Sequence, residues 1–153
     1  MKEKRAQRVG DGIGMTVTED QLISILRDGG YKVTPQRLAI CNYVLSSKEH
    51  PTAEQIHSRM IEKHPTISLT TIYHTLDLLK ELNLVHELSL DDHTSRFDPN
   101  TSVHVNVICQ KCNKIQDFES DSIDELWARI IDEIKTEPIG QRLDLYVLCD
   151  DCR

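Results

Sequence analysis

The sequence has little of what membrane, fibrous or secreted proteins are rich in. No hydrophobic run approaches the roughly 18 residues that span a bilayer. Six glycines and five prolines among 153 residues exclude collagen-like and low-complexity chains, and 39% hydrophobic residues argue against wholesale disorder. Residues 1–15 are charged and lack the apolar core of a signal peptide. We therefore expect a folded cytoplasmic protein of one domain or two small ones.

The patterns that mark common enzyme classes are also missing. The sequence has no glycine-rich phosphate loop, and no serine or cysteine nucleophile lies at a suggestive spacing from a base. A metal-dependent hydrolase would need a spare carboxylate placed as general base, and none is clearly present. We therefore predict that the protein is not an enzyme and has no catalytic residues.

The net charge of −7 is carried by one half of the chain. Residues 1–90 hold 11 basic and 11 acidic residues, whereas residues 91–153 hold 7 and 14. A neutral half with basic side chains on one face can bind nucleic acid even in an acidic protein. Two halves of different character predict two domains, which we place at residues 16–98 and 99–153, after a flexible tail at 1–15.

Helix-capping patterns divide the first half into four helices. Each helix is preceded by a residue whose hydroxyl can cap its first turn; these residues are Thr18, Thr34, Thr52 and Ser68. Apolar residues follow each cap at helical spacing. Alternating segments at 85–90 and 95–98 then predict a β-hairpin, with a turn at Asp91-Asp92-His93-Thr94.

Short helices followed by a hairpin predict a winged helix-turn-helix, with the helix after Ser68 lying in the major groove of DNA. The outward side chains near the start of that helix are Thr70, Thr71, Tyr73 and His74. Such groups can reach phosphates, base edges and thymine methyls. Phosphate contacts would come from Arg37, Arg96, Lys2, Lys4, Arg5 and Arg8. A three-helix core with a solvated face explains the same pattern and stays open.

The second half predicts a small α+β unit. Strands are expected at 103–109, 114–118 and 142–149, packed on a helix that opens with a capping box at Ser122. The apolar stripe of this helix consists of Ile123, Leu126, Trp127, Ile130, Ile131 and Ile134. Three short strands cannot cover so much apolar surface, so we interpret part of the stripe as a subunit interface; an ordinary core is the alternative.

Two C-x-x-C motifs predict a structural zinc site. Their thiols are Cys109, Cys112, Cys149 and Cys152, each pair at the end of a predicted strand. Four thiolates can complete a tetrahedral Zn²⁺ shell, and paired cysteines in a cytosolic chain bind metal more often than they form disulfides. A redox dithiol is the alternative. Cys41 lies alone on an apolar stripe and is expected to be a packed core residue.

A second group of polar residues flanks the predicted domain boundary. It consists of His50, Asp98, His104, Asn106 and Asp117. His104 and Asn106 are two residues apart on one expected strand and so share a face. Nitrogen and oxygen donors suit Mn²⁺, Fe²⁺ or Zn²⁺ better than soft copper. Each residue also has an ordinary surface or structural explanation.

The motifs of the sequence and their order resemble those of a known family. These motifs fall in the order seen in repressors of the ferric uptake regulator (Fur) family, from about Thr18 to Cys152. They are Thr34-Pro35-Gln36-Arg37, His50-Pro51-Thr52-Ala53, Ser68-Leu69-Thr70-Thr71-Ile72-Tyr73, Arg96-Phe97-Asp98 and the double C-x-x-C.

The resemblance implies a homodimer that binds a double-stranded DNA operator through winged helices and dimerises through a zinc-stabilised α/β domain. It also implies that His50, Asp98, His104 and Asp117 fall on ligand positions of a regulatory divalent metal. Asp98 is an aspartate at a position where the peroxide-sensing, PerR-like branch also carries aspartate, so the sequence is similar to that branch. That similarity implies Fe²⁺ or Mn²⁺ at the hinge, oxidation of His50 or His104 by peroxide, and an AT-rich inverted repeat as operator.

Two departures from the family pattern matter. Asn106 stands where most relatives carry a second histidine, so the site either loses a donor or binds through the amide oxygen. His74 replaces the usual arginine or asparagine of the recognition helix, which leaves the base preference open. An iron, manganese or zinc uptake repressor is the alternative within the family, and a zinc-stabilised protein-interaction adaptor is the alternative outside it.

Overall fold

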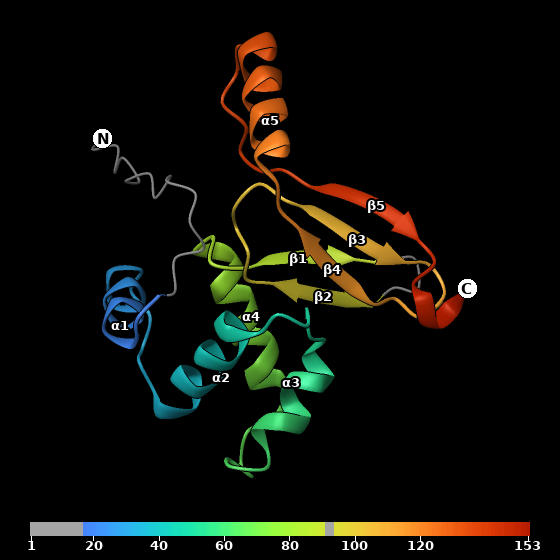
Figure 1. Ribbon diagram of the computed structural model, residues 1–153. Coiled ribbons are helices and arrows are strands. Elements are labelled where there is room, and N and C mark those ends of the chain that lie inside the picture. The colour runs from blue at the N-terminus through green and yellow to red at the C-terminus, as the bar shows by residue number, and fades with distance from the viewer. Residues whose placement is uncertain (1–16, 91–93) are drawn as a thin grey trace.

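The computed structural model of the protein describes residues 17–90 and 94–153. This part of the chain forms five α-helices and two small sheets, and Figure 1 shows their arrangement. The helices are α1 (Glu19–Asp28), α2 (Pro35–Ser46), α3 (Ala53–Met60), α4 (Leu69–Glu81) and α5 (Asp121–Ile134). The strands are β1 (His86–Ser89), β2 (Ser95–Asp98), β3 (Val105–Cys109), β4 (Ile115–Phe118) and β5 (Leu143–Val147), followed by a 3₁₀ turn, η1 (Asp150–Cys152). Within the described ranges, no helix is both long and apolar enough to cross a membrane.

The four helices of the N-terminal half begin where their capping residues predict. The Thr18 hydroxyl accepts a hydrogen bond from the Gln21 N–H, and Thr34, Thr52 and Ser68 cap α2, α3 and α4 in the same way. Gly29 is the C-cap of α1. The next residue, Gly30, has a φ of 81°, which a glycine adopts without strain. Local sequence signals therefore set these helix starts.

These helices share one hydrophobic core. Helix α4 contributes Ile72, Leu76 and Leu79, each at most 1% exposed. Burial of each such side chain stabilises the fold by roughly 1.5–3 kcal/mol. Cys41 of α2 is fully buried in the same cluster, as predicted. Phe97 of the hairpin belongs to this cluster too. This core fixes the position of α4 and of the hairpin strand that carries Phe97.

The hairpin lies between the helices and the second sheet (Figure 1). Strands β1 and β2 pair antiparallel, with His86 opposite Asp98 and Ser89 opposite Ser95. The expected turn residues Asp91, Asp92 and His93 lie outside the described residues. While Phe97 packs on the helices, Leu88 and Leu90 pack on the second sheet, in a cluster with Ile108 and Ile115. The hairpin thus contacts both halves of the chain.

The second sheet has the strand order β4-β3-β5. Strand β3 runs antiparallel to β4 and parallel to β5. The three strands are shorter than the segments predicted from alternation. His104 accordingly lies immediately before β3 rather than inside it, although its side chain still lies on the same side as that of Asn106.

The predicted start of the last helix is wrong by two residues. The N-cap of α5 is Ser120, whose hydroxyl accepts a hydrogen bond from the Ser122 N–H. Ser122 is therefore the second residue of the helix and not its cap. Each serine is followed by an acidic residue within two positions, Asp121 and Asp124 respectively, so the capping pattern alone does not distinguish them.

The prediction that this helix packs on the sheet is also wrong for the single chain. None of the 14 residues of α5, all within the described part of the protein, is buried. Figure 1 shows α5 projecting away from the sheet. On the sheet face that carries Ile108 and Ile115, the hairpin takes the expected place of the helix through Leu88 and Leu90. The opposite face stays uncovered in the single chain, with Phe118 and Leu145 each 54% exposed. The predicted α+β fold class itself is confirmed.

Candidate functional site

The four predicted zinc cysteines lie together at one edge of the second sheet. Their sulfur atoms are within 4.8 Å of one another. Parallel strands end at the same edge of a sheet, and Cys109 is the last residue of β3 while Cys149 follows the end of β5. The sheet therefore brings together two C-x-x-C motifs that are far apart in the sequence.

The sulfur geometry fits a tetrahedral metal shell better than a disulfide. The Cys112 and Cys149 sulfurs are 3.7 Å apart, close to the ~3.8 Å edge of a tetrahedron with Zn–S distances of about 2.3 Å. A disulfide would require about 2.05 Å. Backbone N–H groups of Cys149 and Cys112 point at the Cys109 sulfur and lower the pKa of this thiol to about 6. A thiolate held in this way is the form that binds metal.

The five predicted nitrogen and oxygen donors also meet, at the junction of the two halves. His50 lies between α2 and α3, Asp98 ends β2, and Asp117 lies on β4. His50 Nε2 is 2.8 Å from Asp117 Oδ1 and 3.5 Å from Asp98 Oδ1. Donor atoms of these three side chains are within 4.8 Å of one another.

His104 and Asn106 complete this cluster, which we call the junction site. His104 Nε2 lies 3.1 Å from Asp98 Oδ2 and 3.3 Å from Asn106 Oδ1. The other ring nitrogen of His104, Nδ1, is 2.9 Å from the Ser102 carbonyl oxygen. Because that carbonyl requires Nδ1–H as donor, Nε2 is the nitrogen left to face the site.

Charges of opposite sign are concentrated in this small buried volume. Burial alone lowers the pKa of an imidazole, but the carboxylates of Asp117 and Asp98 outweigh it and raise the pKa of His50 to about 9. Burial also lowers the pKa of His104, but the carboxylate of Asp98 outweighs this effect and the pKa is raised to about 9. Burial favours the neutral form of Asp98, yet the neighbouring imidazoles of His104 and His50 hold its pKa below the ordinary value.

The junction site also has the chemistry that a divalent metal requires. His50 is 2% exposed, and neither of its ring nitrogens has a hydrogen bond of acceptable geometry to any residue that the structure describes. Asp117 Oδ1 is in the same situation despite its short distance to His50. His50 also has a φ of 48°, in the left-handed region that costs a non-glycine residue energy. Buried ligand atoms of His50 and Asp117 that lie close together without a hydrogen bond between them fit a shared cation.

Sequence reasoning missed the residues that support this cluster. Asn100 donates its backbone N–H to Asp98 Oδ1 at 2.8 Å, and its amide group donates to Asp117 Oδ2 at 3.4 Å. Ser102 orients His104, and Asp144 on β5 accepts a hydrogen bond from Asn106. Residues of these types are common on protein surfaces, so only their tertiary contacts identify them as support for the cluster.

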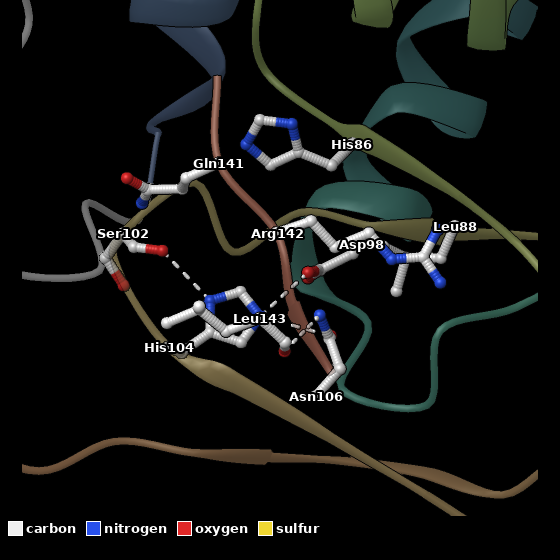
Figure 2. A pocket seen from close by; sticks show the side chains of 9 residues that line it. All are labelled: His86, Leu88, Asp98, Ser102, His104, Asn106, Gln141, Arg142 and Leu143. Carbon is white, nitrogen blue, oxygen red and sulfur yellow. Dashed lines mark hydrogen bonds and ion pairs between the residues drawn. The ribbon is translucent and has the colours of Figure 1, made fainter. Parts of the chain in front are cut away.

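A small cavity adjoins the junction site. Figure 2 shows Asp98, His104 and Asn106 on its wall, with His86 and Gln141 across from them. Its volume is about 20 Å³, enough for a molecule the size of water. A small polar molecule can therefore lie beside His104 and Asp98.

The predicted DNA-reading residues lie together at the start of α4. Thr70 and His74 are exposed, Thr71 is half-buried, and Tyr73 is 42% exposed. The Tyr73 hydroxyl donates to Glu54 Oε1 of α3 at 2.9 Å. The helix thus presents hydroxyls, an imidazole and a tyrosine ring on one accessible surface.

The two predicted phosphate-binding arginines are each held by a neighbour. Arg37 donates to the Lys32 carbonyl, and Arg96 Nη1 donates to Gln55 Oε1 at 3.2 Å. The contribution of either to DNA binding stays a prediction. The other expected phosphate contacts, Lys2, Lys4, Arg5 and Arg8, lie outside the described residues.

A winged helix joined to a zinc-type cysteine cluster, with a nitrogen–oxygen metal site at the junction, defines a metal-responsive DNA-binding regulator. Comparison with known proteins agrees, since the Ferric uptake regulator family profile matches residues 28–146. The chain belongs to the ferric uptake regulator family.

Individual relatives refine this result. The chain is 39% identical to the peroxide-responsive repressor PerR of Staphylococcus epidermidis over 134 residues, which cover 88% of this chain and 89% of that protein. A structure of GAS PerR-Zn-Zn is 30% identical with a TM-score of 0.52, covering 88% of this chain and 86% of the other. The Helicobacter pylori ferric uptake regulator, at 22% identity and a TM-score of 0.73, covers 87% and 89% and supports the fold.

These comparisons confirm the family and the peroxide-responsive branch that the sequence predicts. The curated relatives are named as repressors, which agrees with the prediction that the protein is a regulator rather than an enzyme. The roles of individual metal-binding and DNA-binding residues stay predictions.

Proposed function

We propose that the protein is a metal-dependent, peroxide-responsive transcriptional repressor that acts as a cytoplasmic homodimer. The observation that carries the proposal is the composition of the junction site. His50 and Asp98 come from the N-terminal half, whereas His104, Asn106 and Asp117 come from the C-terminal half. One cation bound by all five would hold the two halves in a fixed relative position. The peroxide-responsive repressors among the relatives support the same function.

In this proposal the two halves have separate roles. Residues 16–98 form the DNA-binding domain, with Thr70, Thr71, Tyr73 and His74 at base edges and Arg37 and Arg96 near phosphates. Residues 99–153 form the dimerisation domain, in which Cys109, Cys112, Cys149 and Cys152 hold Zn²⁺. The exposed apolar stripe of α5 supports this assignment, because it provides surface for a second copy of the chain.

The junction site would control the spacing of the recognition helices. A dimer reads two half-sites only when its recognition helices are about 34–36 Å apart, or a multiple of that distance. Residues of both halves that share one Fe²⁺ or Mn²⁺ would stabilise the DNA-competent arrangement. By linkage, operator DNA must then tighten metal binding by the same factor.

Peroxide would reverse this arrangement through the histidines. Fe²⁺, when held by these residues, would activate peroxide so that one of its oxygen atoms is added to a nearby imidazole and the other leaves as water. The imidazoles of His50 and His104 are the candidates, because Nε2 of each lies among the carboxylates of the junction site. Oxidation of either histidine removes a donor that connects the two halves, so the operator is released.

The test is DNA binding with and without metal. Zinc-loaded protein is titrated against AT-rich inverted-repeat duplexes, and against scrambled duplexes of equal composition, with and without Mn²⁺. We expect Mn²⁺ to tighten binding to the inverted repeat about tenfold or more, and a His50→Ala/His104→Ala variant to lose this response. His64→Ala, which changes a histidine outside the junction site, is the matched control. Equal binding with and without Mn²⁺ would contradict the proposal and favour a protein-interaction adaptor.

An iron, manganese or zinc uptake repressor is the second candidate. Similar structures include a Francisella tularensis ferric uptake regulator with iron, at 29% identity and a TM-score of 0.65 over 80% of this chain and 95% of the other. Such a repressor would show the same metal-dependent DNA binding but would not lose it after mild peroxide treatment of the Fe²⁺ form.

A further inference from the structure

The side-chain amide of Asn106 has a defined orientation in the structure. Asn106 lies opposite Asp144 in the parallel pairing of β3 with β5. Its Nδ2 group donates to Asp144 Oδ1 at 3.3 Å and to the Leu143 carbonyl oxygen at 3.4 Å. Both groups on the β5 side are acceptors, so they select the amide nitrogen. The carbonyl oxygen Oδ1 consequently faces the junction site, 3.3 Å from His104 Nε2.

Asp144 is itself held firmly. Arg142 Nε donates to both carboxylate oxygens, at 3.0 and 2.8 Å, and Arg142 Nη2 lies 2.7 Å from Asp144 Oδ2. Charge-assisted contacts of this kind fix the plane of a carboxylate. Arg142 Nη2 is also 3.4 Å from the Ser89 carbonyl oxygen at the end of β1. A continuous series of contacts thus links the hairpin, through Arg142 and Asp144, to Asn106.

We propose that Asp144 is a positioning residue that makes Asn106 an oxygen donor to the junction site. This inference rests on the proposed metal-binding function of that site. Without Asp144, only the 3.4 Å contact with the Leu143 carbonyl oxygen would hold the amide nitrogen. The amide would then rotate more readily and present its NH₂ group, which cannot bind a cation. With Asp144, the donors are two imidazole nitrogens and oxygens of Asp98, Asn106 and Asp117. An oxygen-rich set shifts the preference toward harder cations such as Mn²⁺.

The consequence of removing this support can be measured as metal affinity. Loss of a residue that orients a metal ligand typically weakens metal binding 10–100-fold. We expect Asp144→Ala to weaken Mn²⁺ binding about tenfold or more, without loss of the cysteine-bound zinc. Asp28→Ala on α1, which removes an exposed carboxylate far from both clusters, is the matched control and should bind Mn²⁺ like the parent.

A double-mutant cycle distinguishes positioning from general stabilisation of the sheet. If Asp144 acts through Asn106, Asp144→Ala should have no further effect on Mn²⁺ affinity in an Asn106→Ala background. The ligand-field spectrum of bound Co²⁺ should change in the same way in both single variants and in the double variant, because all three lose the same oxygen donor. Additive losses, or a Co²⁺ spectrum unchanged by Asp144→Ala, would overturn the inference.

The outcomes also separate this inference from the function on which it rests. If the parent binds no Mn²⁺ beyond its zinc, the proposed function fails. If the parent binds Mn²⁺ but Asp144→Ala binds it within twofold of the parent, only the role of Asp144 is refuted.

Discussion

His50 Nε2 lies 2.8 Å from Asp117 Oδ1, although the two residues belong to opposite halves of the chain. No residue described by the structure gives either atom a hydrogen bond of acceptable geometry. The contact places two ligand-type atoms side by side where the halves meet. Whatever occupies this point influences how the DNA-reading helix is placed relative to the second sheet.

Peroxide treatment of the Fe²⁺-loaded protein should add oxygen to His50 or His104, because these imidazoles face the junction site. Peptide mass spectrometry should locate the added oxygen there, and Mn²⁺-loaded protein should remain unmodified because Mn²⁺ does not supply the same chemistry. His64 serves as an internal control, since it lies outside the site. Equal modification of His64, or of Mn²⁺-loaded protein, would show that the oxidation is not directed by the site.

Metal binding at the junction site should release protons and strengthen as the pH rises. The pKa values of His50 and His104 are raised to about 9 in the metal-free protein, so both imidazoles carry a proton at neutral pH. For each proton that the cation displaces, the apparent affinity for the metal rises about tenfold per pH unit. Calorimetric Mn²⁺ titrations in buffers of different ionisation enthalpy measure the released protons.

The same pKa values set the pH dependence of stability without junction metal. A histidine pKa that is higher in the folded than in the unfolded chain stabilises the fold fully below about 6.5, the unfolded value. That contribution is lost as the pH rises through about 9. The unfolding midpoint of zinc-loaded, Mn²⁺-free protein should therefore fall across this window, and less so in His50→Ala. An equal fall in both proteins would contradict the assignment to His50.

Substitution of a zinc-site cysteine should destabilise the C-terminal half. Cys112→Ser or Cys152→Ser should lose about one zinc per chain and lower the melting temperature by about 10 °C or more, because the metal connects the ends of β3 and β5. Elemental analysis and thermal unfolding measure these effects. Cys41→Ala is the matched control, because Cys41 is buried in the N-terminal core and should leave the zinc content unchanged. Full zinc content in the serine variants would contradict the site.

A charge on the apolar face of α5 should prevent dimerisation without unfolding the chain. Ile130→Asp places a carboxylate within the stripe, where burial against a second copy would be unfavourable. Analytical ultracentrifugation should show a monomer with an unchanged circular dichroism spectrum, because no residue of this fully described helix is buried in the single chain. Ala128→Asp, which adds the same charge to the polar face, should remain dimeric. A monomeric Ala128→Asp would indicate a helix-wide effect.

Much of the N-terminal half could be predicted from local sequence. Thr18, Thr34, Thr52 and Ser68 cap the helices as expected, since a capping hydroxyl acts within three residues along the chain. The same reasoning misplaced the start of α5, where Ser120 and Ser122 compete for one role. Local patterns define a helix well but its first residue less well.

The sequence by itself determined the chemical types of both clusters: four thiols in two pairs, and two histidines with oxygen donors around the junction. Ligand type and spacing are written in the residues, so both groups were identifiable before any fold was known. Only the tertiary structure decided that β3 and β5 run parallel and bring the thiols to one edge. It alone decided that Asp144 fixes the amide of Asn106, and that the hairpin rather than α5 covers the sheet face of Ile108 and Ile115. These outcomes depend on strand direction and on contacts between distant segments, which no local pattern encodes.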